Sequence, residues 1–213
     1  MPIRFTAEQF CDALQRDRTW RIKEVDGLRT LLSSSHQSET VLLRALWVIL
    51  YAHWEGYIRY CVQEYLSYIS SKRLRFKNLR LNFSLLAAST LLDRLSINSP
   101  HGDKINTLQA VLLLPEEVNK SKYSAQIRTN GNLNAKVFCN LCHTVGLSPD
   151  NYGEHFLNFL DEILLANRNS IAHGQSSRVT QKALDEAIPL VLGAMRQFSN
   201  DLQNAAVLEH YRS

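Results

Sequence analysis

The stretch Glu39–Ser71, ETVLLRALWVILYAHWEGYIRYCVQEYLSYISS, decides the fold. It contains no proline and a single glycine, Gly56. Its large apolar side chains recur mostly every three or four residues, at Leu42, Leu46, Ile49, Leu50, Trp54, Tyr57, Ile58, Cys61, Tyr65 and Ile69. That spacing is typical of an α-helix that buries one broad face. The stretch therefore predicts a long helix in the centre of a helical protein.

Helical patterns also lie on both sides of this stretch. Thr6–Gln9 has the spacing of a capping box and predicts a helix that runs to about Leu32. Near the other end, a helical pattern ends at His173-Gly174, and its apolar stripe is Phe156, Phe159, Leu160, Ile163, Leu164 and Ile171. A last helix is predicted from about Thr180 to Tyr211, with Pro189 as a kink or a boundary. Two early and two late helices thus frame the chain.

The middle of the chain, residues 72–136, is less regular. Phe83–Leu95 suits a short helix, and residues 98–103 form a cluster of turn residues. Leu108–Leu114 fits either a helical turn or a short buried strand. Leu133–Gly146 predicts a helix that ends on a C-cap glycine. We therefore predict one all-α domain, residues 1–213, in which residues 72–136 form a partly irregular insertion between the early and late helices.

The composition supports helices and excludes several classes of protein. The 213 residues include 8 Gly and 5 Pro, whereas average usage would give about 26 of the two together. A β-rich fold would need more of these turn residues. The longest low-charge run, Ala45–Gly56, is too short for a membrane helix, which needs about 20 apolar residues. With no apolar signal segment at the N-terminus, we expect a cytoplasmic protein with reduced cysteines and no membrane partner.

The segment Asn167–Gly174, NRNSIAHG, interrupts the apolar pattern of its helix. Five of its eight residues are polar or charged, directly after an apolar run. Asn169 and His173 are four residues apart and share a helix face, and the long Arg168 side chain can reach toward the same space. A plainer alternative is a surface arginine, a histidine favoured at a helix C-terminus, and a C-cap glycine.

Arg168-x4-His173, placed at the end of a late helix that one more long helix follows, resembles the signature of the HEPN superfamily. It particularly resembles bacterial HEPN-like nucleases of the MAE_28990/MAE_18760-like type. The segment Leu42–Arg59 supports this resemblance. It is similar to the core helix of that family, which is apolar except for a glutamate, here Glu55. The resemblance covers the two helical halves and not the middle of the chain. It implies a HEPN-like helical bundle.

The resemblance further implies metal-independent cleavage of RNA, with no cofactor. A histidine suits proton transfer to or from the reacting ribose and phosphate oxygens. An arginine suits the charge that develops on the phosphate. Because one histidine cannot easily be both acid and base in one step, we predict a homodimer that pairs two copies of Arg168 and His173.

Two further residues are expected to support them. Asn169 is predicted to orient a neighbour or bind phosphate, and Glu55 to position Arg168 or His173; the alternative for Glu55 is a solvated or arginine-paired side chain. His53 points elsewhere on its helix and is predicted to be structural. The resemblance implies a toxin or antiviral effector restrained by an antitoxin or other regulatory partner. Some relatives use a tyrosine two residues after the histidine for antitoxin-linked modification; this chain has Gln175 there, so that mechanism is not carried over.

The start of the insertion is strongly basic. Residues 72–136 carry eleven Lys or Arg and four Asp or Glu, a local charge of +7 within a chain of net charge +4. We predict an RNA-binding surface, with Phe76 stacking on bases; the alternative is a solvated charged loop. The cations at the start of this surface are Lys72, Arg73, Arg75, Lys77 and Arg80.

Cys139-x-x-Cys142-His143 matches the spacing of covalent haem attachment. As a structural zinc site it would offer three ligands where four are needed. The favoured interpretation is a buried helix face, and a redox pair is the lesser alternative. No metal site is predicted. The alternative to a nuclease is a noncatalytic helical RNA-binding or protein-assembly module that keeps the Arg168/His173 motif for packing. The sequence does not identify the RNA target, the cut site or the antitoxin.

Overall fold

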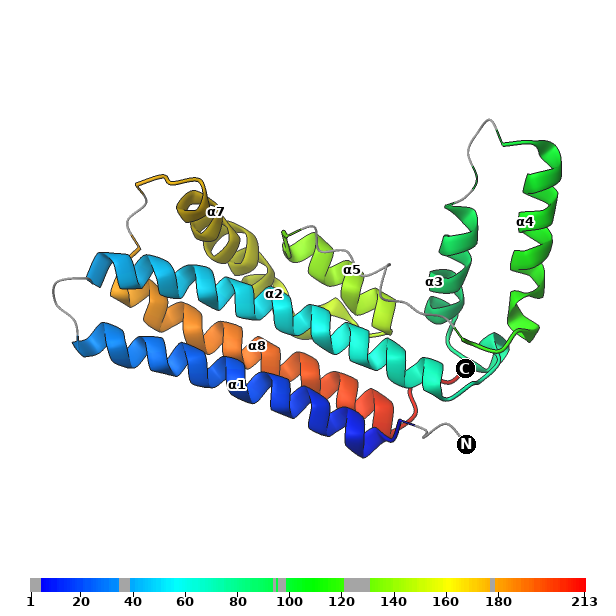
Figure 1. Cartoon of the computed structure of the whole chain (residues 1–213), viewed down its shortest axis with the longest axis horizontal. Helices are drawn as coiled ribbons and strands as arrows, with labels where there is room; N and C mark the ends of the chain where they lie inside the picture. The colour runs from blue at the N-terminus through cyan, green and yellow to red at the C-terminus, as the bar shows by residue number, and fades with distance from the viewer. Residues whose placement is uncertain (1–4, 35–38, 94, 96–98, 121–130, 177–178) are drawn as a thin grey trace.

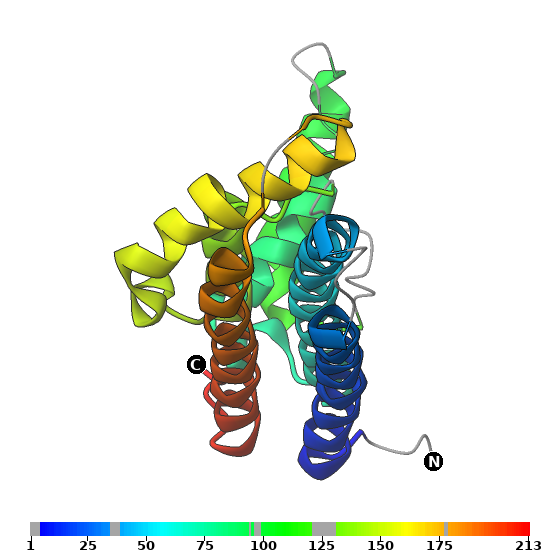
Figure 2. The ribbon, with the colours of Figure 1, turned by 90° about the vertical axis from the view of Figure 1, so that its left-hand side faces the viewer.

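The computed structural model describes residues 5–34, 39–93, 95, 99–120, 131–176 and 179–213. Three long helices run side by side as a bundle: α1 (Ala7–Ser34), α2 (Glu39–Ser71) and α8 (Gln181–Val207) (Figure 1). Figure 2 shows them nearly end-on, with the helix that carries the Arg168/His173 motif crossing them obliquely. Within the described residues, β pairing is limited to two isolated bridges. The prediction of an all-α fold is confirmed.

The early helices begin and end where local signals predicted. Thr6 donates its N–H to Gln9 Oε1 (3.0 Å), and Gln9 donates its N–H to Thr6 Oγ1 (3.1 Å), which confirms the capping box. α2 spans the predicted stretch and supplies much of the core, because most of its apolar side chains are buried. A Cβ at Gly56 would lie 2.8 Å from Arg21 Nη1, so a larger residue here would displace the end of that flexible side chain of α1.

The insertion is more helical than predicted. It contains a 3₁₀ turn at Phe76–Asn78, α3 (Leu81–Leu92), α4 (His101–Leu113) and a second 3₁₀ turn at Leu114–Glu116. α3 and α4 stand beside each other at the C-terminal end of α2 (Figure 1). The segment 108–114 is thus mostly helical, which excludes the strand. The predicted turn at 98–103 is wrong for residues 101–103, which form the first turn of α4 directly after Pro100; residue 98 lies outside the described residues.

α5 (Ala135–Val145) lies within the stretch Leu133–Gly146 that was predicted to be a helix. The Asn134 side chain caps its start by accepting a hydrogen bond from the Val137 N–H (2.8 Å), and Gly146 caps its end with φ of 80°. Cys142 is buried in the core, and Cys139 is partly buried. Burial raises the pKa of both thiols, so both stay protonated and unreactive at neutral pH. This agrees with the buried helix face predicted for the pair.

The late helix contains an irregularity that the sequence pattern did not predict. α6 (Gly153–Phe159) continues through a π-helical turn at Leu160–Leu165 into α7 (Ala166–Ala172). A π-helical turn rotates less per residue than an α-helix, so the buried face shifts along it. Leu164 and Leu165 are buried, whereas Ile163, which the uniform stripe placed in the core, is 42% exposed.

α8 closes the bundle. Pro189 lies inside this helix, which excludes the boundary from the two predicted alternatives, a kink or a boundary. The helix ends at Val207 rather than at Tyr211, and the final residues turn back so that Arg80 N–H donates to the Tyr211 carbonyl (2.9 Å). Among the described residues, no helix combines the length and the apolar character needed to cross a membrane.

Candidate active site

The helix that carries the Arg168/His173 motif packs across the N-terminal half of α2. Trp47 of α2 donates its indole N–H to the Leu164 carbonyl, in the π-helical turn, over 3.1 Å in a buried setting. One turn later, the Arg168 guanidinium lies over the Tyr51 ring, 5.0 Å from its centroid. This cation–π contact fixes the direction of a long side chain that is partly buried. Packing on α2 thus determines where Arg168 points.

Asn169 holds the other side of Arg168. The guanidinium Nη1 donates to Asn169 Oδ1 over 2.8 Å. The arginine fork therefore has a ring beneath it and an amide oxygen beside it, and both restrain its plane. Such restraint lets the remaining N–H groups present a fixed geometry to an oxyanion.

Glu55 joins this cluster through Tyr51. The Tyr51 hydroxyl accepts the Leu133 N–H (2.7 Å). Burial, together with the nearby Glu55 charge, raises the pKa of Tyr51, so the ring stays neutral. Glu55, Tyr51, Arg168 and Asn169 form one connected polar cluster on the α2 side of the motif.

His173 lies at the exposed end of α7. Its backbone N–H still bonds to the Asn169 carbonyl (2.9 Å), but its side chain is exposed. The chain then turns at Gly174, with φ of 71°, and the Gln175 N–H closes the turn on the Ser170 carbonyl (3.0 Å). The imidazole is therefore accessible to a substrate. This placement equally matches the plainer alternative of a helix-terminal histidine followed by a C-cap glycine.

A cavity of about 620 Å³ lies next to the turn after His173. Its lining includes Gly174, Gln175 and Ser176 on one side and Arg44 of α2 on the other. Arg44 Nη1 donates to the Gln175 carbonyl over 3.0 Å, and Ser170 Oγ donates to Gln175 Oε1 over 2.9 Å. The turn at the end of the motif helix is thus hydrogen-bonded both to α2 and to its own helix.

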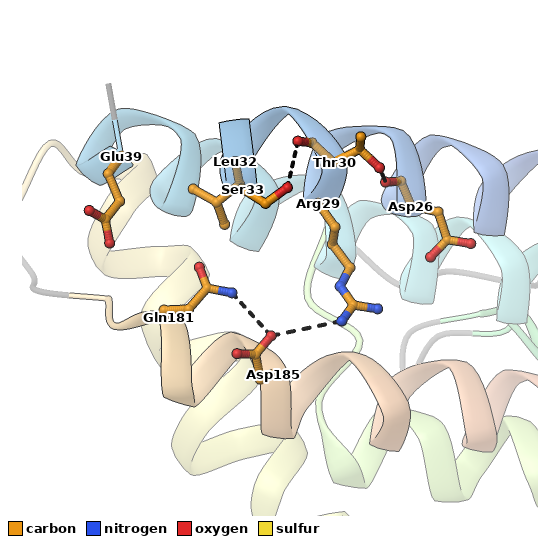
Figure 3. A pocket seen from close by; sticks show the side chains of 8 residues that line it. All are labelled: Asp26, Arg29, Thr30, Leu32, Ser33, Glu39, Gln181 and Asp185. Carbon is orange, nitrogen blue, oxygen red and sulfur yellow. Dashed lines mark hydrogen bonds and ion pairs between the residues drawn. The ribbon is translucent and has the colours of Figure 1, made fainter. Parts of the chain in front are cut away.

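A larger cavity of about 720 Å³ adjoins the first, with Glu39 and Gln181 lining both (Figure 3). Arg29 Nη2 lies 3.9 Å from Asp185 Oδ1, which also accepts a hydrogen bond from Gln181 Nε2 (3.1 Å). Three carboxylates line this cavity against one guanidinium: those of Asp26, Glu39 and Asp185. That balance repels a polyanion, so size alone does not make this cavity the RNA site.

The predicted RNA-binding cations lie at the other end of α2 from the motif. Taking about 1.5 Å per helical residue, Lys72 is roughly 30 Å along α2 from Tyr51. Lys72 Nζ sits 4.0 Å from the centre of the Tyr68 ring and donates to a backbone carbonyl. Arg75 and Lys77 both pair with Glu116, at 3.0 and 2.9 Å.

The remaining members of that group differ from one another. Arg80 Nη1 donates to the Gly146 carbonyl (3.0 Å) at the end of α5. Arg73 is exposed, with a positive φ of 54°. Phe76 is only 3% exposed and packs in the core, so the prediction that it stacks on bases is wrong. Hydrogen bonds and ion pairs within the protein thus restrain much of this basic stretch.

His53 is structural, as predicted. It is buried between α1 and α2, with Nε2 2.8 Å from Glu24 Oε2 and Nδ1 3.5 Å from Arg21 Nη1. Burial lowers the pKa of His53, although Glu24 opposes the shift. This network belongs to the packing of α1 on α2.

Sequence reasoning missed three residues that contact the motif segment. These are Arg44, Trp47 and Tyr51, all on α2. With Glu55 they are spaced by three, four and four residues, which places them on one face of the helix. Polar side chains that recur on one face of α2 were the signal that could have identified them. The apolar periodicity of this helix is stronger and obscures that signal.

A model of the HEPN_MAE_28990-like HEPN family matches residues 10–211 of the chain. The match includes both the motif helix and α2. The chain matches no curated protein and no solved structure. In the described part of the chain, no group of three or more His, Cys, Asp or Glu side chains is arranged to hold a metal ion.

Proposed function

The chain belongs to the HEPN_MAE_28990-like HEPN family, whose members are commonly ribonucleases, and on that premise we propose that it is a metal-independent endoribonuclease. One observation carries the proposal. The exposed imidazole of His173 lies five residues after Arg168 in the sequence. Tyr51 and Asn169 hold the Arg168 guanidinium in place. The two groups supply proton transfer and phosphate stabilisation, the requirements for attack by a ribose 2′-hydroxyl on its own phosphodiester.

In this mechanism, His173 exchanges a proton with the attacking or the leaving oxygen. The O–P bond to the 2′-oxygen forms while the bond to the 5′-oxygen breaks. Arg168 donates hydrogen bonds to the phosphate oxygens as charge accumulates on them. Asn169 and Tyr51 keep the guanidinium oriented, and the nearby Glu55 carboxylate orients the Tyr51 hydroxyl.

A second copy of the chain completes the site in this proposal. Five residues separate Arg168 from His173, which corresponds to about 140° around an α-helix. Arg168 is turned onto α2, whereas His173 lies at the exposed helix end. A two-fold dimer would bring two imidazoles to one phosphate, so that one acts as the base and the other as the acid.

We also propose that RNA reaches the basic stretch at the far end of α2. Because Glu116 neutralises part of the charge of Arg75 and Lys77, the contribution of each cation is smaller than its formal charge suggests. Arg73 is the most direct phosphate-binding candidate among them, since its side chain is exposed and Glu116 pairs with Arg75 and Lys77 instead.

Changing Arg73, Arg75 and Lys77 together to Gln is expected to weaken RNA binding and to lower its salt slope by up to about 2, since each contact to a single strand contributes about 0.7. The slope is measured by titrating RNA at several salt concentrations, in a His173→Ala background that leaves the RNA intact. Changing Lys23, Arg59 and Lys182 to Gln removes the same charge elsewhere and serves as the control. Equal slopes for the two triple variants would show that the stretch is a solvated loop.

The 2′-hydroxyl mechanism predicts the chemistry of the products. In excess EDTA, the wild-type protein is expected to leave a 2′,3′-cyclic phosphate and a 5′-hydroxyl at the cut, identified by mass spectrometry. A single 2′-deoxy nucleotide at the mapped cut site is expected to abolish cleavage there, because the attacking oxygen is missing. Cleavage of the deoxy substrate, or a 5′-phosphate product, would show a different reaction.

The setting that fits this activity is a toxin or antiviral effector restrained by an antitoxin or regulatory partner. A cytoplasmic ribonuclease without restraint would degrade its host's RNA. The noncatalytic RNA-binding or assembly module is the other outcome of these experiments. It would be supported by RNA binding with no cleavage in any condition.

A further inference from the structure

The turn that carries His173 is restrained mainly by hydrogen bonds. His173, Gly174 and Gln175 are all exposed, and an ideal Cβ built on Gly174 would meet no atom within 4 Å. This part of the chain therefore gains little from packing. Its geometry depends on the polar contacts that hold it.

Three of those contacts converge on Gln175. Its N–H donates to the Ser170 carbonyl (3.0 Å), and its Oε1 accepts the Ser170 hydroxyl (2.9 Å). Both of these connect the turn to its own helix. The third, from Arg44 Nη1 to the Gln175 carbonyl (3.0 Å), connects it to α2, across 131 residues of sequence.

Arg44 completes a series of attachments between one face of α2 and the motif segment. Trp47 holds the Leu164 carbonyl before the motif, and the Tyr51 ring lies beneath Arg168 at its start. Arg44 holds the turn after its end. Trp47 and Tyr51 restrain the helix that carries Arg168, whereas Arg44 restrains the exposed turn that carries His173.

We propose that Arg44 is a positioning residue of the site, which fixes the His173 imidazole relative to Arg168 by holding the Gln175 carbonyl against α2. The inference rests on the proposed ribonuclease function and assigns a role to a residue outside the Arg-x4-His motif. A guanidinium suits the task because its N–H groups are directional and always charged. The last carbonyls of a helix and its C-terminal turn lack partners within the helix and carry partial negative charge.

The kinetic test compares Arg44→Gln and Arg44→Lys in the full chain, with kcat and KM measured separately on a defined RNA. Misplacing a catalytic group by about 1 Å costs up to about 10²-fold in rate. We therefore expect Arg44→Gln to lower kcat by about 10- to 100-fold with little change in KM. Arg44→Lys should recover part of the loss, because an ammonium also donates to the carbonyl but without a rigid fork.

The matched control is Arg29→Gln. Arg29 is a partly exposed arginine of α1 in the cavity next to that of Arg44, so its loss changes the net charge equally without touching the motif turn (Figure 3). It should leave kcat unchanged. A rise in KM with unchanged kcat for Arg44→Gln would identify Arg44 as a phosphate ligand instead. Unchanged kcat and KM would remove it from the site altogether; both outcomes overturn the proposal.

A second measurement does not depend on cleavage. Amide hydrogen exchange of Gln175 and the NMR signals of the His173 ring report how the turn is held. In Arg44→Gln, the Gln175 amide should exchange at least several-fold faster and the His173 ring signals should shift, with the melting temperature nearly unchanged. Unchanged exchange would refute the positioning role. Faster exchange in a protein that cleaves no RNA would instead place the failure with the proposed ribonuclease function.

Discussion

Changing His173 to alanine is expected to lower the rate of RNA cleavage by about 10²- to 10⁴-fold, the usual contribution of a general acid or base. The same change should hardly affect folding, because the imidazole is exposed and its helix is held through the backbone and through Gln175. Cleavage is measured under single-turnover conditions with protein in excess, and stability by thermal denaturation.

His155→Ala is the matched control for that variant. His155 is also exposed and lies on the same continuous helix, but on α6, before the π-helical turn. Its loss should leave cleavage unchanged. If His173→Ala cleaves RNA as fast as the wild type, proton transfer by His173 is excluded.

Changing Arg168 to alanine is expected to lower cleavage by about 10²- to 10³-fold, the cost of removing one donor to a developing oxyanion. Arg168→Lys should recover only part of the loss, because an ammonium keeps the charge but lacks the planar fork. Arg168 is partly buried and contacts Asn169 and Tyr51, so a moderate loss of stability is also expected.

Two measurements separate catalysis from folding in the Arg168 variants. Rates are compared well below each variant's melting temperature, and the circular dichroism spectrum checks helix content. Arg196→Ala, which removes an exposed arginine from α8, is the control for net charge. Full activity in Arg168→Ala would show that the arginine has no catalytic role, as the noncatalytic alternative holds.

Local signals predicted the helices whose limits depend on nearby residues. The capping box gave the start of α1, the apolar pattern and the absence of Pro and other Gly residues gave α2, and Gly146 gave the end of α5. Pro189 left the prediction of α8 open between a kink and a boundary, because a surrounding tertiary fold tolerates a proline that isolated helix propensity would not.

The remaining differences arise from tertiary contacts. The exposure of Ile163 follows from the π-helical turn, which α2 stabilises through Trp47. The burial of Phe76 depends on how the insertion packs on the core. Likewise, nothing near Arg75 and Lys77 in the sequence announces Glu116, about 40 residues away, as their common partner.

Some residues of the candidate site could likewise be predicted from local sequence, and others could not. The spacing of Arg168, Asn169 and His173 identified them, because their chemistry is encoded within one short segment. Glu55 was identified as the only acid between Glu39 and Glu64, and in the structure its charge lies near Tyr51. Arg44, Trp47 and Tyr51 were missed because their roles exist only once the motif helix packs across α2.

The most direct test of the central claim is cleavage of a mixed RNA pool by the purified protein in excess EDTA, run in parallel with His173→Ala and Arg168→Ala. We predict cleavage by the wild type that EDTA does not reduce and that both variants lose while they keep the wild-type fold. Absence of wild-type cleavage across the pool, restoration of cleavage only by added divalent metal, or equal cleavage by all three proteins would contradict a metal-independent ribonuclease built on Arg168 and His173.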